Sequence, residues 1–251
     1  MMEIREKFES IAVANAIGET KKKFSDLRTK YTRLAIDSME RAVSCPEKVV
    51  AIIESSSAKI IYNEELFDPK IRESKDIFDS KLDTIALVLE SPHTKEFCKG
   101  RAIAPAMGET GTNIKKCLLG NLAKFTTIND LEENGAYFKS SSPIVEGKYN
   151  LLLINAVQYQ CSLGNLSGNA NKVTRDRIFH DCFADEVFQN DFIVRLKKYS
   201  PKIILNCCTA GIVDGITLQN QVQEIIDKNF PAAIKMRGAH PSSPWFAKGF
   251  R

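Results

Sequence analysis

Four apolar runs after residue 82 have the composition of buried β-strands. They cover residues 85–89, 151–157, 202–207 and 232–236. The first is a continuous β-prone run, as expected of a strand covered on both faces in a parallel sheet. Stretches with helical patterning separate the runs, at residues 113–122, about 181–198 and 218–228. This alternation predicts an α/β fold with a central four-stranded parallel sheet and helices on both faces.

The chain before these strands has a different pattern, which favours helices. Apolar residues follow helical spacing before Gly18, and a second apolar stripe runs from Phe24 to Met39. Pro46 suits the first turn of another helix, running to about residue 57, and residues 58–62 suit a short edge strand. We therefore expect a helical N-terminal extension at residues 1–75 and an α/β domain at residues 76–251. The basic residues beside the stripe fit a solvated face or a contact with the DNA backbone.

Composition adds limits on the class of protein. A hydrophobic content of 43% and a charged content of 26% are typical of a soluble globular protein. No apolar run approaches the roughly 18 residues that span a bilayer, and the N-terminus lacks a secretory signal, so we expect a cytoplasmic protein. The seven cysteines include no C-x-x-C pair, which argues against a disulfide framework and a zinc or iron–sulfur site. The net charge of +4 permits a nucleic-acid partner without requiring one.

Polar side chains follow three of the predicted strands. Glu90 and His93 come after the first, Asn155 closes the second, and His240 follows the fourth. Because open α/β sheets bind ligands at the carboxyl ends of their strands, these residues are expected to form one site.

Two loops have compositions that suit phosphate binding. The segment at residues 238–250 contains Ser242 and Ser243, whose hydroxyl and backbone N–H groups can hold phosphates. Its apolar tip, residues 244–246, fits either packing under neighbouring structure or a wedge that separates bases. Thr112 and Asn113 open a predicted helix whose N-terminal amides can also hold a phosphate. The P-loop, dinucleotide-binding and serine-hydrolase motifs are absent from the sequence.

Four segments, taken together, resemble motifs of the uracil-DNA glycosylase superfamily. Residues 89–93, Leu-Glu-Ser-Pro-His, are similar to its water-activating loop of the form G-Q-D-P-Y-H or G-E-A-P-G. Residues 152–157, Leu-Leu-Ile-Asn-Ala-Val, nearly repeat its base-reading strand L-L-L-N-A-V. Residues 240–250 keep the length of its closing motif H-P-S-P-L-S-A-H-R-G-F, and residues 202–210 fall where the family has its third strand. The resemblance covers about residues 82–251 and implies a three-layer glycosylase fold.

The resemblance also implies catalytic roles. His240 would donate a hydrogen bond to the carbonyl oxygen of the departing base, where negative charge develops. Asn155 would read the edge of the base through its amide. Glu90 would orient water and stabilise the oxocarbenium-like sugar, with Ser91 beside it where the uracil-specific branch has its catalytic aspartate.

Further residues take binding roles from the same resemblance. His93 and Ile103 would lie against the base, Ser242, Ser243 and Lys248 would contact phosphates, and Trp245 or Phe246 would serve as the wedge. No metal or cofactor is required. The expected partner is duplex or single-stranded DNA, bound by a monomer without a protein partner.

Departures from the family suggest the substrate. His93 replaces a tyrosine that crowds the 5-position of the base, and residues 99–107 lack a clear match to the stacking phenylalanine. A roomier pocket fits a bulky 5-modified cytosine of phage DNA, such as glucosylated hydroxymethylcytosine, removed by bacterial anti-phage glycosylases. Uracil or another deaminated base is the alternative, because poorly paired bases cost less to flip. The rival functions are a DNA-sensing protein without catalysis and a nucleotide-handling enzyme unrelated to DNA.

Overall fold

One mixed sheet forms the centre of the molecule. The computed structural model describes residues 18–27, 43–54, 59–63, 77–98, 101–126, 147–161, 169–244 and 246. Six strands lie in the order β10-β7-β3-β6-β1-β2. Their bounds are β1 Lys48–Glu54, β2 Lys59–Tyr62, β3 Asp83–Leu89, β6 Lys148–Asn155, β7 Ile203–Asn206 and β10 Ile234–Arg237. The four predicted strands are present and mutually parallel, but β1 and β2 add an antiparallel pair. The expectation of a purely parallel four-stranded sheet is therefore wrong.

Strand β1 occupies the segment predicted to be a helix after Pro46. Its sequence, KVVAIIE, is rich in β-branched residues, which lose side-chain freedom in a helix and pack well on a pleated surface. It pairs with β6 on one side and with β2 on the other, so residues 48–54 and 59–62 contribute to the central sheet and not to a helical extension. Strand β2 confirms the predicted edge strand, and residues 18–27 are helical as expected. The other N-terminal positions of the predicted helices lie outside the described residues.

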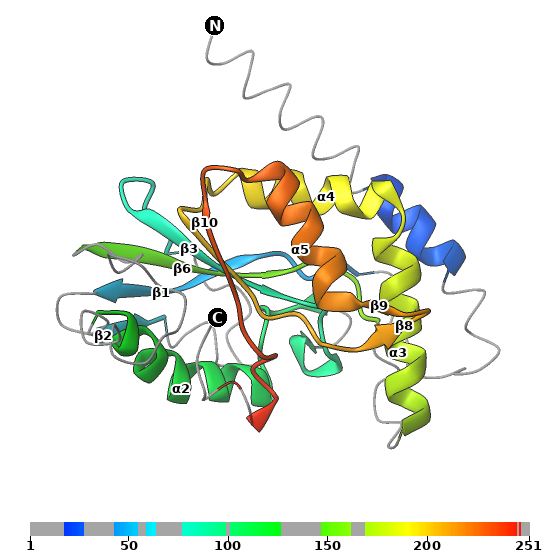
Figure 1. Ribbon diagram of the computed structural model, residues 1–251, viewed down its shortest axis with the longest axis horizontal. Coiled ribbons are helices and arrows are strands. Elements are labelled where there is room, and N and C mark those ends of the chain that lie inside the picture. Colours follow the sequence, from blue (N-terminus) through cyan, green and yellow to red (C-terminus); the bar gives the residue numbers. More distant parts are fainter. Residues whose placement is uncertain are drawn as a thin grey trace, which may run out of the picture.

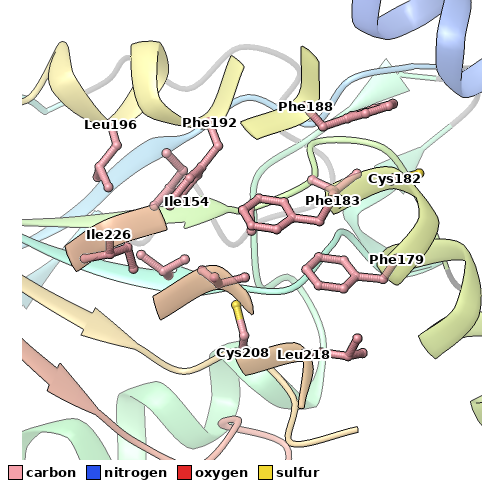
Figure 2. Packing of buried hydrophobic residues seen from close by; sticks show 14 of the residues in the cluster. Ile154, Phe179, Cys182, Phe183, Phe188, Phe192, Leu196, Cys208, Leu218 and Ile226 are labelled. Carbon is pink, nitrogen blue, oxygen red and sulfur yellow. The ribbon is translucent and has the colours of Figure 1, made fainter. Parts of the chain in front are cut away.

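Both faces of the central strands β3, β6 and β7 are buried, which explains their continuous apolar runs. Alternate residues of β3 point to opposite sides: Ala86 and Val88 belong to one apolar cluster, and Ile85 and Leu87 to the other. Helix α2 (Glu109–Thr126) covers one face, and α3 (Asn169–Phe183), α4 (Glu186–Lys197) and α5 (Leu218–Asn229) cover the other (Figure 1). Figure 2 shows the cluster that includes Ala86 and Val88, where phenylalanines of α3 and α4 meet β6 and α5. The result is the expected three-layer α/β arrangement.

Two of the predicted helices are confirmed and one is divided. Helices α2 and α5 include the predicted ranges. The helix expected near residues 181–198 is two helices, because Asp185 ends the turn after α3 and caps α4, accepting a hydrogen bond of 2.9 Å from the Val187 N–H. The Asp185 carboxylate also pairs with Lys23, at 2.8 Å, and so ties residues 18–27 to α4. Most of α3 was not predicted.

A short hairpin follows β7. Strands β8 (Ile212–Val213) and β9 (Ile216–Thr217) are joined by Asp214 and Gly215, with φ values of 49° and 80°. Positive φ at both central residues is the signature of the type I′ turn, which Asp-Gly favours. Arg177 of α3 pairs with Asp214 at 2.8 Å and fixes the hairpin against that helix.

The remaining short elements are a 3₁₀ turn (Thr94–Glu96) and the β4–β5 pair (Phe97–Cys98 and Arg101–Ala102). None of the described helices is long and apolar enough to cross a membrane.

Candidate active site

A cavity of about 800 Å³ opens at the carboxyl ends of β3, β7 and β10. Its lining consists of Glu90 after β3, Lys172 and Arg175 of α3, residues 208–211 after β7, Gln219 of α5, and residues 237–240, 242 and 243 after β10. The chain passes from β3 to β6 on one side and then returns to β7 on the other side of β3. Open α/β sheets bind ligands at such a switch point, so topology alone directs attention to this cavity.

Glu90 lies at the floor of this cavity. Its backbone carbonyl accepts a hydrogen bond of 3.0 Å from Val157, which holds the residue between the ends of β3 and β6. The residue is only 4% exposed. Oε1 lies 3.4 Å from Nε of Arg175 but accepts no hydrogen bond from the described residues. A buried carboxylate oxygen without a hydrogen-bond donor is costly unless a ligand or water supplies one.

The charge state of Glu90 is finely balanced. Burial raises the pKa of its carboxyl group from 4.5 to about 7, and the nearby charge of Asp176 adds to the rise. The Arg175 guanidinium and a hydrogen bond from Ser91 oppose it and lower the same pKa. Glu90 can therefore change protonation near neutral pH, as groups in active sites often do.

His240 enters the cavity from the loop after β10. Its Nδ1 accepts a hydrogen bond of 3.2 Å from the backbone N–H of Ser242 and lies 2.8 Å from the Ser242 hydroxyl. Because a backbone N–H can only donate, Nδ1 is the unprotonated nitrogen and Nε2 carries the proton. Burial and the charge of Arg175 lower the pKa of His240 to about 4. The ring is thus a neutral hydrogen-bond donor at physiological pH.

The loop that holds His240 is rigidly fastened. The Ser243 N–H donates to the His240 carbonyl at 2.7 Å, and the Phe246 N–H donates to the Ser243 carbonyl at 3.0 Å. Asn113, at the start of α2, donates from Nδ2 to the carbonyl of Pro241 at 2.8 Å. Its side chain therefore anchors the loop. Phe246 is packed in the apolar cluster beneath α2, so it does not serve as the predicted wedge.

Gln219 connects two of the strand ends. Its Nε2 donates to the carbonyls of Asn206, Cys208 and Gly238, at 3.0, 3.3 and 2.7 Å. These contacts join the end of β7 to the loop after β10 and form one wall of the cavity. The sequence reasoning did not identify Gln219.

Asn155 lies apart from this cavity. It is 1% exposed and is not one of the described lining residues. Its Nδ2 donates to Oε2 of Glu96 at 3.4 Å, while Oδ1 has no hydrogen-bond partner among the described residues. Arg195, itself buried, donates to the Asn155 carbonyl at 3.0 Å and fixes the end of β6.

Glu96 is a second buried acid that the sequence reasoning missed. Burial raises the pKa of its carboxyl group to about 7, against the effect of hydrogen bonds from the backbone of Ala106 and His93 and from the side chains of Asn155 and Cys45. The Cys45 thiol donates to Oε2 at 3.8 Å. Glu96 thus links the loop after β3 to the segment that precedes α2.

The remaining predicted residues are dispersed. Ser91 is half-buried beside Glu90, and Ile103 is half-buried in the segment before α2. His93 is exposed, and its Nδ1 accepts from the backbone of Lys95 at 3.3 Å. Thr112 is exposed on the first turn of α2. None of these four is among the described residues that line the cavity, and Trp245 and Lys248 lie outside the described residues.

Comparisons of the chain with family models, curated proteins and solved structures find no match. Within the described part of the chain, no cluster of three or more His, Cys, Asp or Glu side chains is arranged to hold a metal ion.

The cavity also contains residues that sequence reasoning missed. Arg175 and Lys172 belong to α3, a helix that was largely not predicted. The hairpin that follows residues 208–211 carries a sequence signal that was not used, the Asp-Gly pair between β-branched residues. Recognising Asp185 as the cap of α4 would have separated α4 from a preceding helix.

Proposed function

We propose that the protein is a monofunctional DNA glycosylase. It flips a modified or damaged pyrimidine nucleotide out of DNA and hydrolyses the bond between base and deoxyribose, leaving an abasic site. The observation that carries the proposal is the meeting of Glu90 and a neutral His240 in one cavity at the sheet's switch point. A carboxylate and a neutral imidazole are the two groups that this reaction needs on opposite sides of the breaking bond.

His240 acts on the leaving base. As the glycosidic bond breaks, its electron pair moves onto the base, and negative charge develops on the base's carbonyl oxygen. The Nε2–H of His240 donates to that oxygen, and its orientation is preset by the Ser242 contacts to Nδ1. Because the pKa of His240 is about 4, the ring is already neutral at physiological pH. It therefore donates this hydrogen bond without first releasing a proton.

Glu90 acts on the sugar. Its ionised carboxylate stabilises the positive charge that develops at C1′ and orients the water that adds there. One water proton is released as the new C1′–O bond forms, and the departing base takes up a proton from solvent. The unsatisfied Oε1 of Glu90 supports this role, because a water or the sugar can supply the missing donor.

The size of the cavity supports a bulky substrate. A cavity of about 150 Å³ accommodates a benzene ring, so the 800 Å³ here is several times the room that a pyrimidine ring occupies. A 5-substituted cytosine such as glucosylated hydroxymethylcytosine would use the additional space and its polar lining. We propose this base in phage DNA as the substrate, and defence against phage as the role.

A DNA-binding or sensing protein without catalysis is the second candidate. It is favoured by the burial of Asn155, whose amide is engaged with Glu96 and not with the cavity. Ser91, in place of an aspartate, points in the same direction.

A glycosylase assay separates the two candidates. Duplex and single-stranded DNAs carrying uracil, hypoxanthine, 5-hydroxymethylcytosine or its glucosylated form are incubated with protein, and alkali reveals abasic sites. His240→Ala and Asn155→Ala are the test variants, with His180→Ala and the exposed Asn190→Ala as matched controls away from the cavity. Cleavage only at the glucosylated base, lost in His240→Ala, is the expected result. Cleavage at uracil alone would overturn the substrate, and tight binding without any cleavage would favour the sensing protein.

A further inference from the structure

Arg175 occupies a central place in the cavity that the proposed chemistry has not used. Its Nε lies 3.4 Å from Oε1 of Glu90 and 2.9 Å from Oδ1 of Asp176. A second nitrogen, Nη2, also pairs with Asp176 Oδ1. One guanidinium therefore bridges two carboxylates, and its remaining surface lines the cavity together with His240.

The position of Asp176 depends on a glycine in another segment. Asp176 is 5% exposed, and its carboxylate lies against Gly211 in the loop after β7. A Cβ atom at position 211 would lie 2.3 Å from Asp176 Oδ2, closer than atoms can approach without displacement. Gly211 thus leaves room for the acid that orients Arg175, and β7 and α3 jointly determine where the guanidinium lies.

The charge of Arg175 acts on both groups of the proposed mechanism. It lowers the pKa of Glu90, and it also lowers the pKa of His240. The other charged group that acts on Glu90 is Asp176, also on α3, which raises the pKa of Glu90. Lys172 and Arg237 complete the charged lining. A single cation in this place favours the ionised acid and the neutral imidazole at the same time.

We propose that Arg175, oriented by Asp176 against Gly211, is a positioning residue that favours the ionised form of Glu90 and the neutral form of His240 in the reactive cavity. This inference rests on the proposed glycosylase function. Its first test requires no substrate, so it can fail or succeed separately from that function.

The test is an NMR titration of the histidines. The chain has only three, which makes the signal of His240 readily assignable. Arg175→Met removes the charge while keeping much of the apolar length, and Arg175→Lys keeps the charge without the two-sided fork. Arg177→Met is the matched control, because Arg177 lies on the same helix but pairs with Asp181 and Asp214 outside the cavity. We expect a raised pKa of His240 in Arg175→Met, a value near wild type in Arg175→Lys, and no change in Arg177→Met.

The pH profile of activity gives a second, signed readout. Loss of Arg175 raises the pKa of Glu90, so the acidic limb should move to higher pH, with activity lost at about pH 6 and recovered at about pH 9. Asp176→Asn removes the charge that raises the pKa of Glu90, so the acidic limb should move to lower pH. A merely structural role would reduce activity in both variants at every pH.

The outcomes distinguish the two proposals. An unchanged His240 titration in a folded Arg175→Met protein overturns the role of Arg175, even if the wild type cleaves DNA. If Arg175→Met does not fold, Asp176→Asn and Arg175→Lys still decide: an acidic limb that does not move to lower pH in Asp176→Asn, or a pKa of His240 in Arg175→Lys that departs from wild type, overturns the role. A shifted titration in a protein that cleaves none of the substrates supports the role of Arg175 while the glycosylase proposal fails.

Discussion

Replacing Glu90 by glutamine should stabilise the protein while abolishing the proposed glycosylase activity. Glu90 is 4% exposed, and burial raises the pKa of its carboxyl group from 4.5 to about 7. A raised carboxyl pKa means that folding disfavours the ionised form, so this group reduces stability as pH rises from 4.5 through about 7. At about 1.4 kcal/mol for each pH unit, the cost reaches about 3 kcal/mol above pH 7. Glutamine is nearly isosteric and carries no such cost.

Chemical denaturation across pH measures this effect. At about pH 4 both proteins carry a neutral side chain and should have equal free energies of unfolding, whereas at about pH 9 Glu90→Gln should be more stable by about 3 kcal/mol. Glu224→Gln, at an exposed position of α5, is the control and should show no such pH-dependent gain. A difference that does not grow with pH, or a glutamine variant that is less stable at pH 9, would refute the reasoning and show that Arg175 outweighs burial.

Three further variants probe the framework of the site. Gly211→Ala should destabilise the protein by about 1–3 kcal/mol in thermal unfolding, because the new Cβ collides with the Asp176 carboxylate; an unchanged melting temperature would contradict that packing. Arg195→Met should cost about 3–5 kcal/mol, because it leaves Asp191 buried without its partner at 2.8 Å; denaturant unfolding showing a smaller loss than 1 kcal/mol would argue against the buried network. Asn113→Ala removes the hydrogen bond that anchors the loop after β10 and should cost about 1 kcal/mol; hydrogen exchange should show faster exchange of the Ser243 and Phe246 amides, and unchanged protection there would count against the anchor.

The strand pattern was the most reliable part of the sequence reasoning. Strands buried on both faces need apolar residues at nearly every position, so β3, β6 and β7 stand out without any knowledge of their partners. Strand β1 was wrongly predicted because Pro46 and the preceding helical pattern outweighed its β-branched composition. Whether a short apolar segment becomes strand or helix depended here on the open edge of β6, which is a tertiary feature.

The candidate site was predictable only where a residue stands next to a strand. Glu90 follows β3 directly, His240 lies in the loop after β10, and parallel strands bring their carboxyl ends to one edge. Arg175 lies within a helix, and no local pattern marks it as facing Glu90. Asn155 ends a strand, but the order of strands places it beside the Glu96 loop, on the far side of β3 from the cavity.

The sequence by itself determined the α/β class, the four parallel strands and the polar groups at their ends, because burial on two faces and the chain's alternation leave local traces. Only the tertiary structure decided which of those groups meet. Strand order, the packing of α3 over the sheet and the room left by Gly211 are set by contacts between residues far apart in the chain. The charge states of Glu90 and His240 arise from the same contacts, since burial and the position of one guanidinium control them.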